Sequence, residues 1–169
     1  MQGNTSMWQA YLIDPNHAEI CEFVRQVEPS IKKDLEQAST MVLKEQYEQA
    51  SVHLKKGLDK HKNHYELNLL KAFLLRKQKK FSDTIYILER MDEYLTKLHP
   101  SALPADEMAR RKSKISDNFA LLYNDMAAYL FEQHDYKDAS MLFLQAKKFK
   151  INDAGILCNI GDCALVKDI

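Results

Sequence analysis

The sequence predicts an all-α protein, and three observations carry that prediction. The 169 residues include four glycines and four prolines, less than half of the roughly 12% that these turn formers make up in average proteins. So few turn residues argue against a fold with many strands. Small and large side chains also fall four residues apart, on one stripe of a helix. Finally, a pattern of small and aromatic residues returns after 34 positions, a period typical of stacked helix pairs.

Charge and cysteine content argue against several classes of protein. Lysine and arginine number 24, as do aspartate and glutamate, so no net field draws the whole chain to nucleic acid or to a membrane surface. No apolar run reaches about 18 residues and the N-terminus lacks a signal-peptide pattern, which together predict a cytoplasmic protein. Cys21, Cys158 and Cys163 do not suit a disulfide framework, and we expect reduced thiols that are mostly buried.

Residues 1–30 are predicted to hold a partial preceding repeat and a linker helix. The stretch MWQAYLIDPNH reads as the end of a helix followed by the proline that closes a unit. Residues 31–64 are the first full unit, in which small Ala38 precedes Ala50 and Leu54. A small residue at Ala38 lets neighbouring helices approach to about 8–10 Å, and Ala50 and Leu54 share one stripe of the second helix.

The same pattern returns in residues 65–98 and 120–153, the second and third units. The pattern consists of Ala38, Tyr47, Ala50, Leu54 and Gly57 in the first unit, Ala72, Phe81, Thr84, Leu88 and Met91 in the second, and Ala127, Tyr136, Ala139, Phe143 and Ala146 in the third. Each residue of the first set lies 34 positions before its counterpart in the second. Residues 154–169 are predicted to be the first helix of a further, truncated repeat, with Gly161 in the small position.

An insertion separates the second and third units, because their aromatic residues are 55 rather than 34 positions apart. The surplus falls in residues 99–119, which we predict to be an inserted loop followed by a helix extension. Pro100 and Pro104 exclude a helix from the loop, whereas the acidic pair that begins at Asp106 suits a helix N-terminus. We expect the next helix to begin near Asp106 and to project several turns beyond its neighbours.

The two ends of the sequence lead us to expect that the native chain continues in both directions. The first residues read as the tail of an earlier helix. The last predicted helix carries apolar side chains that no second helix covers, whereas stacks of this kind normally end in a polar helix. These side chains are Ile156, Leu157, Ile160, Ala164 and Leu165.

This pattern resembles the tetratricopeptide repeat (TPR), a unit of two antiparallel helices in which an aromatic residue starts the second helix. The resemblance implies a right-handed superhelix, an α-solenoid of antiparallel helix pairs, that binds proteins in a concave groove lined by the first helices. Carried onto this sequence, the groove positions favour Glu66, Phe73, Arg76, Asn124 and Phe131 as protein-binding residues. Such a surface suits an extended or helical peptide. Ordinary helix packing is the competing explanation for the leucines at other groove positions, which are Leu35, Leu69 and Leu121.

Three segments resemble the tetratricopeptide repeat protein 16 family more closely: LIDPNHAEI, the 21-residue expansion and INDAGILCNIGDC. That resemblance implies a long, non-catalytic scaffold, a component of the axoneme in ciliated or flagellated cells. The alternatives are a structural component built permanently into a microtubule-based assembly and a co-chaperone-like peptide-binding adaptor. Positions that clamp chaperone tails elsewhere in the wider repeat family hold Leu35, Ser39, Leu70 and Asp125 here, which argues against the adaptor.

A basic patch, defined as Arg110, Arg111, Lys112 and Lys114, lies near the start of the predicted extended helix. The helix dipole disfavours positive charge there, so a further cause is needed. The patch either binds an acidic partner, such as a tubulin tail or an axonemal protein, or forms a solvated face. Duplex nucleic acid needs basic charge along a groove-sized face, and we predict none bound.

The histidines His61 and His64 are three residues apart, a spacing that suits zinc on a helix. They fall at an expected turn beside Lys60 and Lys62, whose charges repel a cation, so we predict no metal site. The sequence has neither a nucleophile elbow nor a phosphate-binding glycine loop. We therefore predict no enzyme, no cofactor, no small-molecule substrate and no membrane partner, and we expect partners that are proteins.

Overall fold

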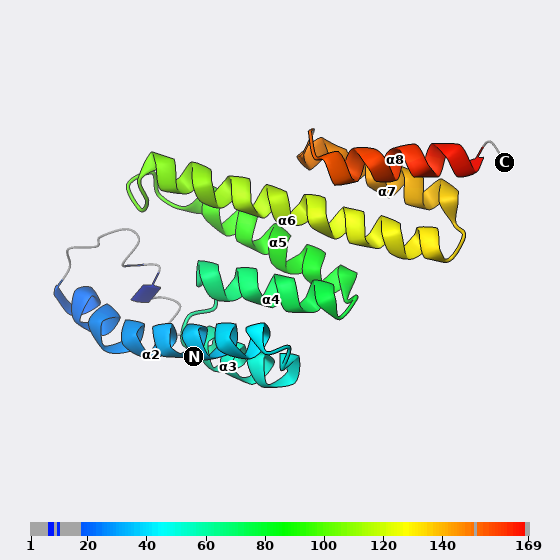
Figure 1. Cartoon of the computed structure of the whole chain (residues 1–169). Coiled ribbons are helices and arrows are strands. Elements are labelled where there is room, and N and C mark those ends of the chain that lie inside the picture. The colour runs from blue at the N-terminus through cyan, green and yellow to red at the C-terminus, as the bar shows by residue number, and fades with distance from the viewer. Residues whose placement is uncertain (1–6, 9, 11–17, 151, 168–169) are drawn as a thin grey trace.

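The computed structural model describes residues 7, 8, 10, 18–150 and 152–167. No strand occurs among these residues, which confirms the all-α prediction. Nor is any described helix long and apolar enough to cross a membrane. The helices labelled in Figure 1 are α2 (Ala18–Leu43), α3 (Tyr47–Lys60), α4 (Tyr65–Lys77), α5 (Phe81–Lys97), α6 (Ala105–Glu132), α7 (Tyr136–Phe149) and α8 (Ala154–Lys167).

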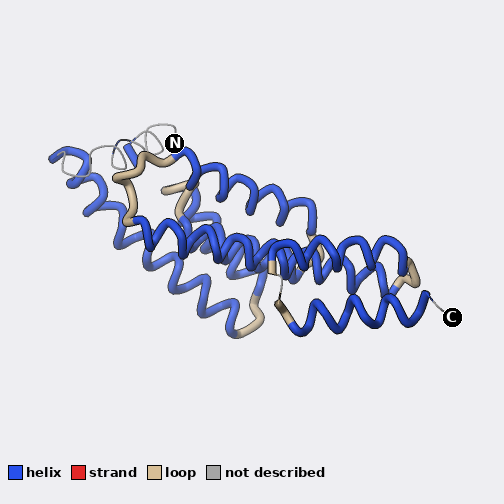
Figure 2. The backbone as a smooth tube through the Cα atoms, turned by 90° about the horizontal axis from the view of Figure 1, so that it is seen from above, coloured by secondary structure: helices blue, strands red, loops and turns tan. Residues whose placement is uncertain are grey.

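The helices pack as antiparallel pairs that follow one another from α2–α3 at one end to α6–α7 at the other, where the single helix α8 follows (Figure 1). Figure 2 shows the same elongated arrangement of helices from above. Within the pairs, α2 contacts α3, α4 contacts α5 and α6 contacts α7. The first helix of each pair also contacts the first helix of the next, since α2 meets α4, α4 meets α6 and α6 meets α8. Each pair is therefore covered by its neighbours along the chain.

The turn inside each of the three pairs has the same backbone conformation. Glu45, Lys79 and His134 lie in the left-handed region, with φ of 58°, 58° and 63°. In the first turn the Gln46 N–H donates to the Met41 carbonyl at 2.9 Å, and equivalent bonds of 2.9 and 3.0 Å close the other two. This is the Schellman closure of a helix end, which usually employs glycine. Here none of the three left-handed residues is glycine.

The residues of the repeating pattern are buried in all three pairs, except for the aromatic residues, which are half-buried. The small side chains are 0–2% exposed: Ala38, Ala50, Ala72, Thr84, Ala127 and Ala139. The Thr84 hydroxyl donates to the Lys80 carbonyl at 2.9 Å, which satisfies its polar group inside the core. Each second helix, α3, α5 and α7, begins at the predicted aromatic residue.

The expectation that Gly161 occupies an equivalent close contact is wrong. Gly161 of α8 is exposed, and a Cβ atom there would meet nothing within 4 Å. The reason is that α8 packs on α6 and α7 through other positions, chiefly Ile156 and Cys163. Leu165 on the same helix is exposed, as expected, whereas the thiol of Cys158 is exposed rather than buried.

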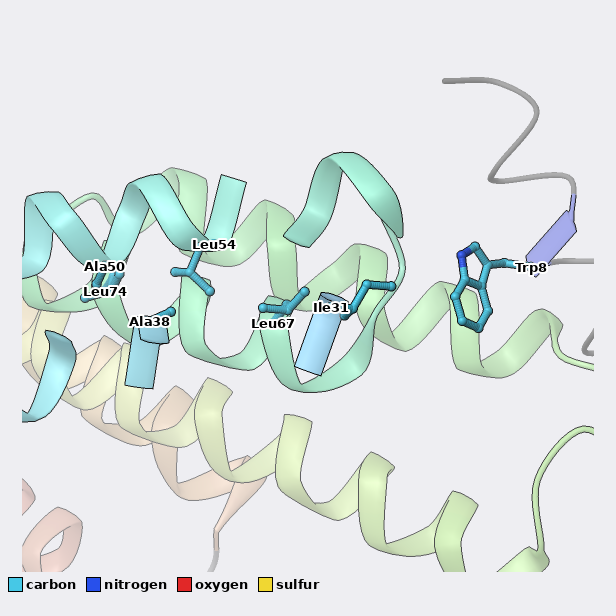
Figure 3. Close-up of a cluster of buried hydrophobic side chains, with 7 residues drawn as sticks. All are labelled: Trp8, Ile31, Ala38, Ala50, Leu54, Leu67 and Leu74. Carbon is cyan, nitrogen blue, oxygen red and sulfur yellow. The ribbon is translucent and has the colours of Figure 1, made fainter. Parts of the chain in front are cut away.

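Helix α2 begins 13 residues before the predicted start of the first unit and continues through Pro29. Proline removes one N–H donor and crowds the preceding turn, and it usually interrupts a helix. The helix nevertheless continues because residues on both sides of the proline, Ile20 and Ile31, are buried. Figure 3 shows Ile31 in the first hydrophobic cluster beside Leu67 of α4, while Ala38 lies further along, near Ala50 and Leu74.

Helix α6 begins at Ala105, close to the predicted start, but its first turns do not project from the molecule. Ile115 is 1% exposed and shares a hydrophobic cluster with Tyr65, against which Met108 also packs. The expected projection is therefore wrong, because apolar side chains place the extension from residues 99–119 on α5 and on the start of α4.

Candidate protein-binding cleft

Two of the five predicted groove residues join first helices to one another. The Arg76 guanidinium of α4, 11% exposed, donates to the Asp125 carboxylate of α6 at 2.9 Å. The Asn124 side-chain oxygen of α6 accepts a hydrogen bond from Asn159 Nδ2 of α8 at 2.8 Å. These polar contacts fix the positions of successive first helices, and they occupy groups that the sequence assigned to a ligand.

The other three predicted groove residues differ from one another in burial and in the side chains they contact. Phe73 is half-buried against the first cluster, with the Arg76 guanidinium 5.8 Å from its ring centroid. Phe131 packs edge-on against Tyr136, with ring centroids 5.1 Å apart. Glu66 is exposed. None of the five residues lines the large cleft described below.

The basic patch is partly neutralised within the chain. Both Arg110 and Arg111 donate to the Glu107 carboxylate, at 2.8 Å and 2.7 Å respectively. Hydrogen bonds, first from Arg110 and then from Arg111, lower the pKa of Glu107 to about 2. Lys112 and Lys114 are exposed. Glu107 therefore offsets the unfavourable interaction of Arg110 and Arg111 with the helix dipole.

The histidines of the α3–α4 loop form an aromatic contact. The His61 ring stacks on Trp8, with centroids 4.2 Å apart, and meets His64 edge-on at 5.7 Å. Burial, and secondarily the neighbouring His64, lowers the pKa of His61 to about 3, so the ring is neutral at pH 7. Among the described residues no group of three histidines, cysteines or carboxylates could hold a metal ion.

A cleft of about 600 Å³ opens between α3 and α5, where residues of α4 also line it. Helix α4 contacts both neighbours and lies between them in Figure 1. Aliphatic side chains such as Leu58, Leu75 and Ile87 share the lining with Tyr86 and Tyr94. Tyr86 is 56% exposed, with the Arg90 guanidinium 5.6 Å from its ring centroid, so this wall offers aromatic surface next to a cation.

The charges of the cleft are strongly unequal, although the whole chain is balanced. Asp59 is the one carboxylate among the lining residues. The cations of the lining come from α3 to α6: Lys55, Lys62, Lys71, Lys80, Arg90 and Arg111. A surface of this kind attracts negative charge and repels other cations.

Tyr65 stands at the end of the cleft where α4 begins. The Arg111 guanidinium lies 4.6 Å from its ring centroid, a cation–π contact that brings one basic-patch residue into the cleft. Burial raises the pKa of Tyr65, so its hydroxyl stays protonated at pH 7. That hydroxyl is buried and has no hydrogen-bond partner in the described part of the chain.

The cleft was not predicted from the sequence, although the sequence of α5 carries one pattern that indicates it. Tyr86 and Arg90 are four residues apart, on a face of α5 distinct from buried Leu88. An aromatic residue and an arginine on a solvent-facing stripe are typical of protein interfaces.

No family model matches the sequence, and neither a curated protein nor a solved structure matches it.

Proposed function

We propose that the chain is a non-catalytic protein-interaction scaffold, folded as a right-handed superhelix of the tetratricopeptide type. The observation that supports this best is the identity of the three turns, each closed by the same bond pattern around a left-handed residue. Contacts between successive first helices fit the same architecture. Stacked helix pairs present extended surfaces, and binding other proteins is the common use of such surfaces.

The cleft supports protein binding because tyrosine and arginine are the residues that most often carry interface energy. Lys112 and Lys114, the exposed members of the basic patch that do not pair with Glu107, are additional candidate contacts. Placement in the axoneme rests on the sequence resemblance alone. The permanently built-in structural component and the co-chaperone-like adaptor have no specific observation in their favour.

A displayed library of natural protein segments tests the scaffold proposal. The folded chain should select segments that bind reversibly with Kd on the order of micromolar, and the heat-denatured chain should not. Isothermal titration of the selected segments should give one site per chain. Selection of nothing beyond what the denatured chain retains would contradict the proposal.

A further inference from the structure

We propose that the cleft between α3 and α5 binds an acidic amphipathic helix of a partner protein. The apolar face of that helix packs on the tyrosine and aliphatic side chains, and its carboxylates pair with the surrounding cations. This inference rests on the proposed scaffold function, because it names the partner class of that scaffold. It assigns the partner to the cleft rather than to the groove residues favoured by the sequence.

The dimensions of the cleft favour a helix. Lining residues run along α4 from Tyr65 to its C-cap Gln78, and along α5 from its N-cap Lys80 to Leu95. At 1.5 Å per residue, the α4 stretch is about 20 Å long, the length of a helix of about 14 residues. A groove between helices that exposes apolar side chains along such a length is the usual receptor for an amphipathic helix.

The distribution of charge favours a long ligand over a compact anion. Lys62 and Arg111 lie at the end where α4 begins, Lys71 and Arg90 lie along the cleft, and Lys80 follows the end of α4. These groups are distributed along the length of the cleft, whereas a single phosphate or carboxylate is compact. A helix with a carboxylate on each turn would face the lysines and Arg90 in succession, whereas Arg111 is already paired with Glu107. Charge complementarity of this kind sets partner choice and association rate.

The tyrosines supply contacts that the cations do not. Tyr86 exposes more than half of its surface, and the Arg90 guanidinium donates to its hydroxyl at 3.0 Å, so a ligand that covers Tyr86 gains apolar burial beside a cation. Tyr65 holds the Arg111 guanidinium, a hydrogen-bond donor of the lining, 4.6 Å from its ring centroid at the end of the cleft. Apolar surface and donors are therefore available together, as an amphipathic acidic helix requires.

Fluorescence anisotropy with designed peptides tests this inference. The probe is a labelled 14-residue peptide with leucine at positions 1, 4, 8 and 11 and glutamate in most other positions. It should bind with Kd on the order of micromolar and become helical by circular dichroism. The same peptide with lysine in place of every glutamate should bind at least about tenfold more weakly.

Charge reversal in the chain locates the binding. The double variant Lys55→Glu, Arg90→Glu changes two cations of the lining and should weaken binding of the acidic peptide about tenfold. The matched control Lys56→Glu, Lys148→Glu changes the net charge equally at exposed positions outside the lining, and its Kd should stay within about twofold of the parent.

Removal of an aromatic side chain gives a second location test. Tyr86→Ala should also weaken binding about tenfold, because tyrosine is a frequent interface anchor. Met141→Ala truncates a side chain of similar exposure on α7 and should leave the Kd unchanged. Both side chains are largely exposed, so circular dichroism spectra and melting temperatures should match the parent.

Each outcome decides the inference. Equal binding of the lysine peptide, or unchanged Kd in the cleft variants, would overturn it. Displacement of the acidic peptide by oleate at lower concentration would assign the cleft to a lipid and overturn it as well. If the display library yields binders but no acidic helix binds, this inference fails and the scaffold proposal stands; if neither binds, both fail.

Discussion

Replacing Ala127 with leucine should destabilise the protein, because its surroundings leave no room for a larger side chain. Ala127 of α6 is 0% exposed and lies in a cluster with Ala139, Phe143 and Cys163. Leucine adds three carbon atoms where α6, α7 and α8 meet. Overpacking of a close-packed interior lowers the free energy of unfolding by about 1–3 kcal/mol, and helix propensity adds little because both residues favour helices.

Thermal melts followed by circular dichroism measure that loss. For a chain of this length, a loss of about 1–3 kcal/mol lowers Tm by about 2–12 °C. Ala109→Leu is the matched control, since Ala109 is exposed on the same helix, and its Tm should move by less than about 2 °C. Ala72, 2% exposed in α4, should behave like Ala127. Equal melts for the Ala127 and Ala109 variants would refute the packing argument.

Three further perturbations follow from the backbone and from the pKa values. Glu45→Gly should raise the unfolding free energy by about 0.5–1 kcal/mol, because glycine adopts the left-handed conformation without steric strain. The control Glu36→Gly, inside α2, should lower the unfolding free energy by about 1 kcal/mol. Urea titrations that give both changes the same sign would contradict this. The pKa of Glu107 falls from 4.5 to about 2 on folding, so its ion pairs stabilise the protein above pH 4.5 and are lost as pH falls toward 2. The Tm difference between the parent and Glu107→Gln should shrink over that interval, and a constant difference would count against the pairing. The pKa of His61 falls from 6.5 to about 3, so stability declines as pH drops from 6.5 toward 3, and His61→Gln should lose less stability than the parent over that range in urea titrations at successive pH values.

The helix faces that pack together could be predicted because a repeated pattern records them. Small residues such as Ala38 and Ala72 recur wherever two helices approach closely, and both are buried. The turn conformation could not be predicted in the same way. Glu45 and Lys79 adopt the left-handed conformation without the glycine that usually signals it, and backbone groups alone form the closing bonds.

Contacts between repeats could not be predicted from the pattern of one repeat. Arg76 stood at a groove position, but its partner Asp125 lies 49 residues later, beyond the insertion. The cleft likewise depends on the separation of α3 from α5, which the packing of α4 between them sets. Periodicity assigns residues to faces of a helix, while the gap between two helices depends on side chains of a third.

Amide chemical shifts of the ¹⁵N-labelled chain, recorded during titration with the acidic 14-residue peptide, report the position of the bound helix. We predict the largest saturable shifts at Lys71, Tyr86 and Arg90, which line the cleft. Phe73 and Asn124, which lie outside it, should change little. The largest shifts at Phe73 and Asn124 would place the partner on the first helices and contradict binding in the cleft.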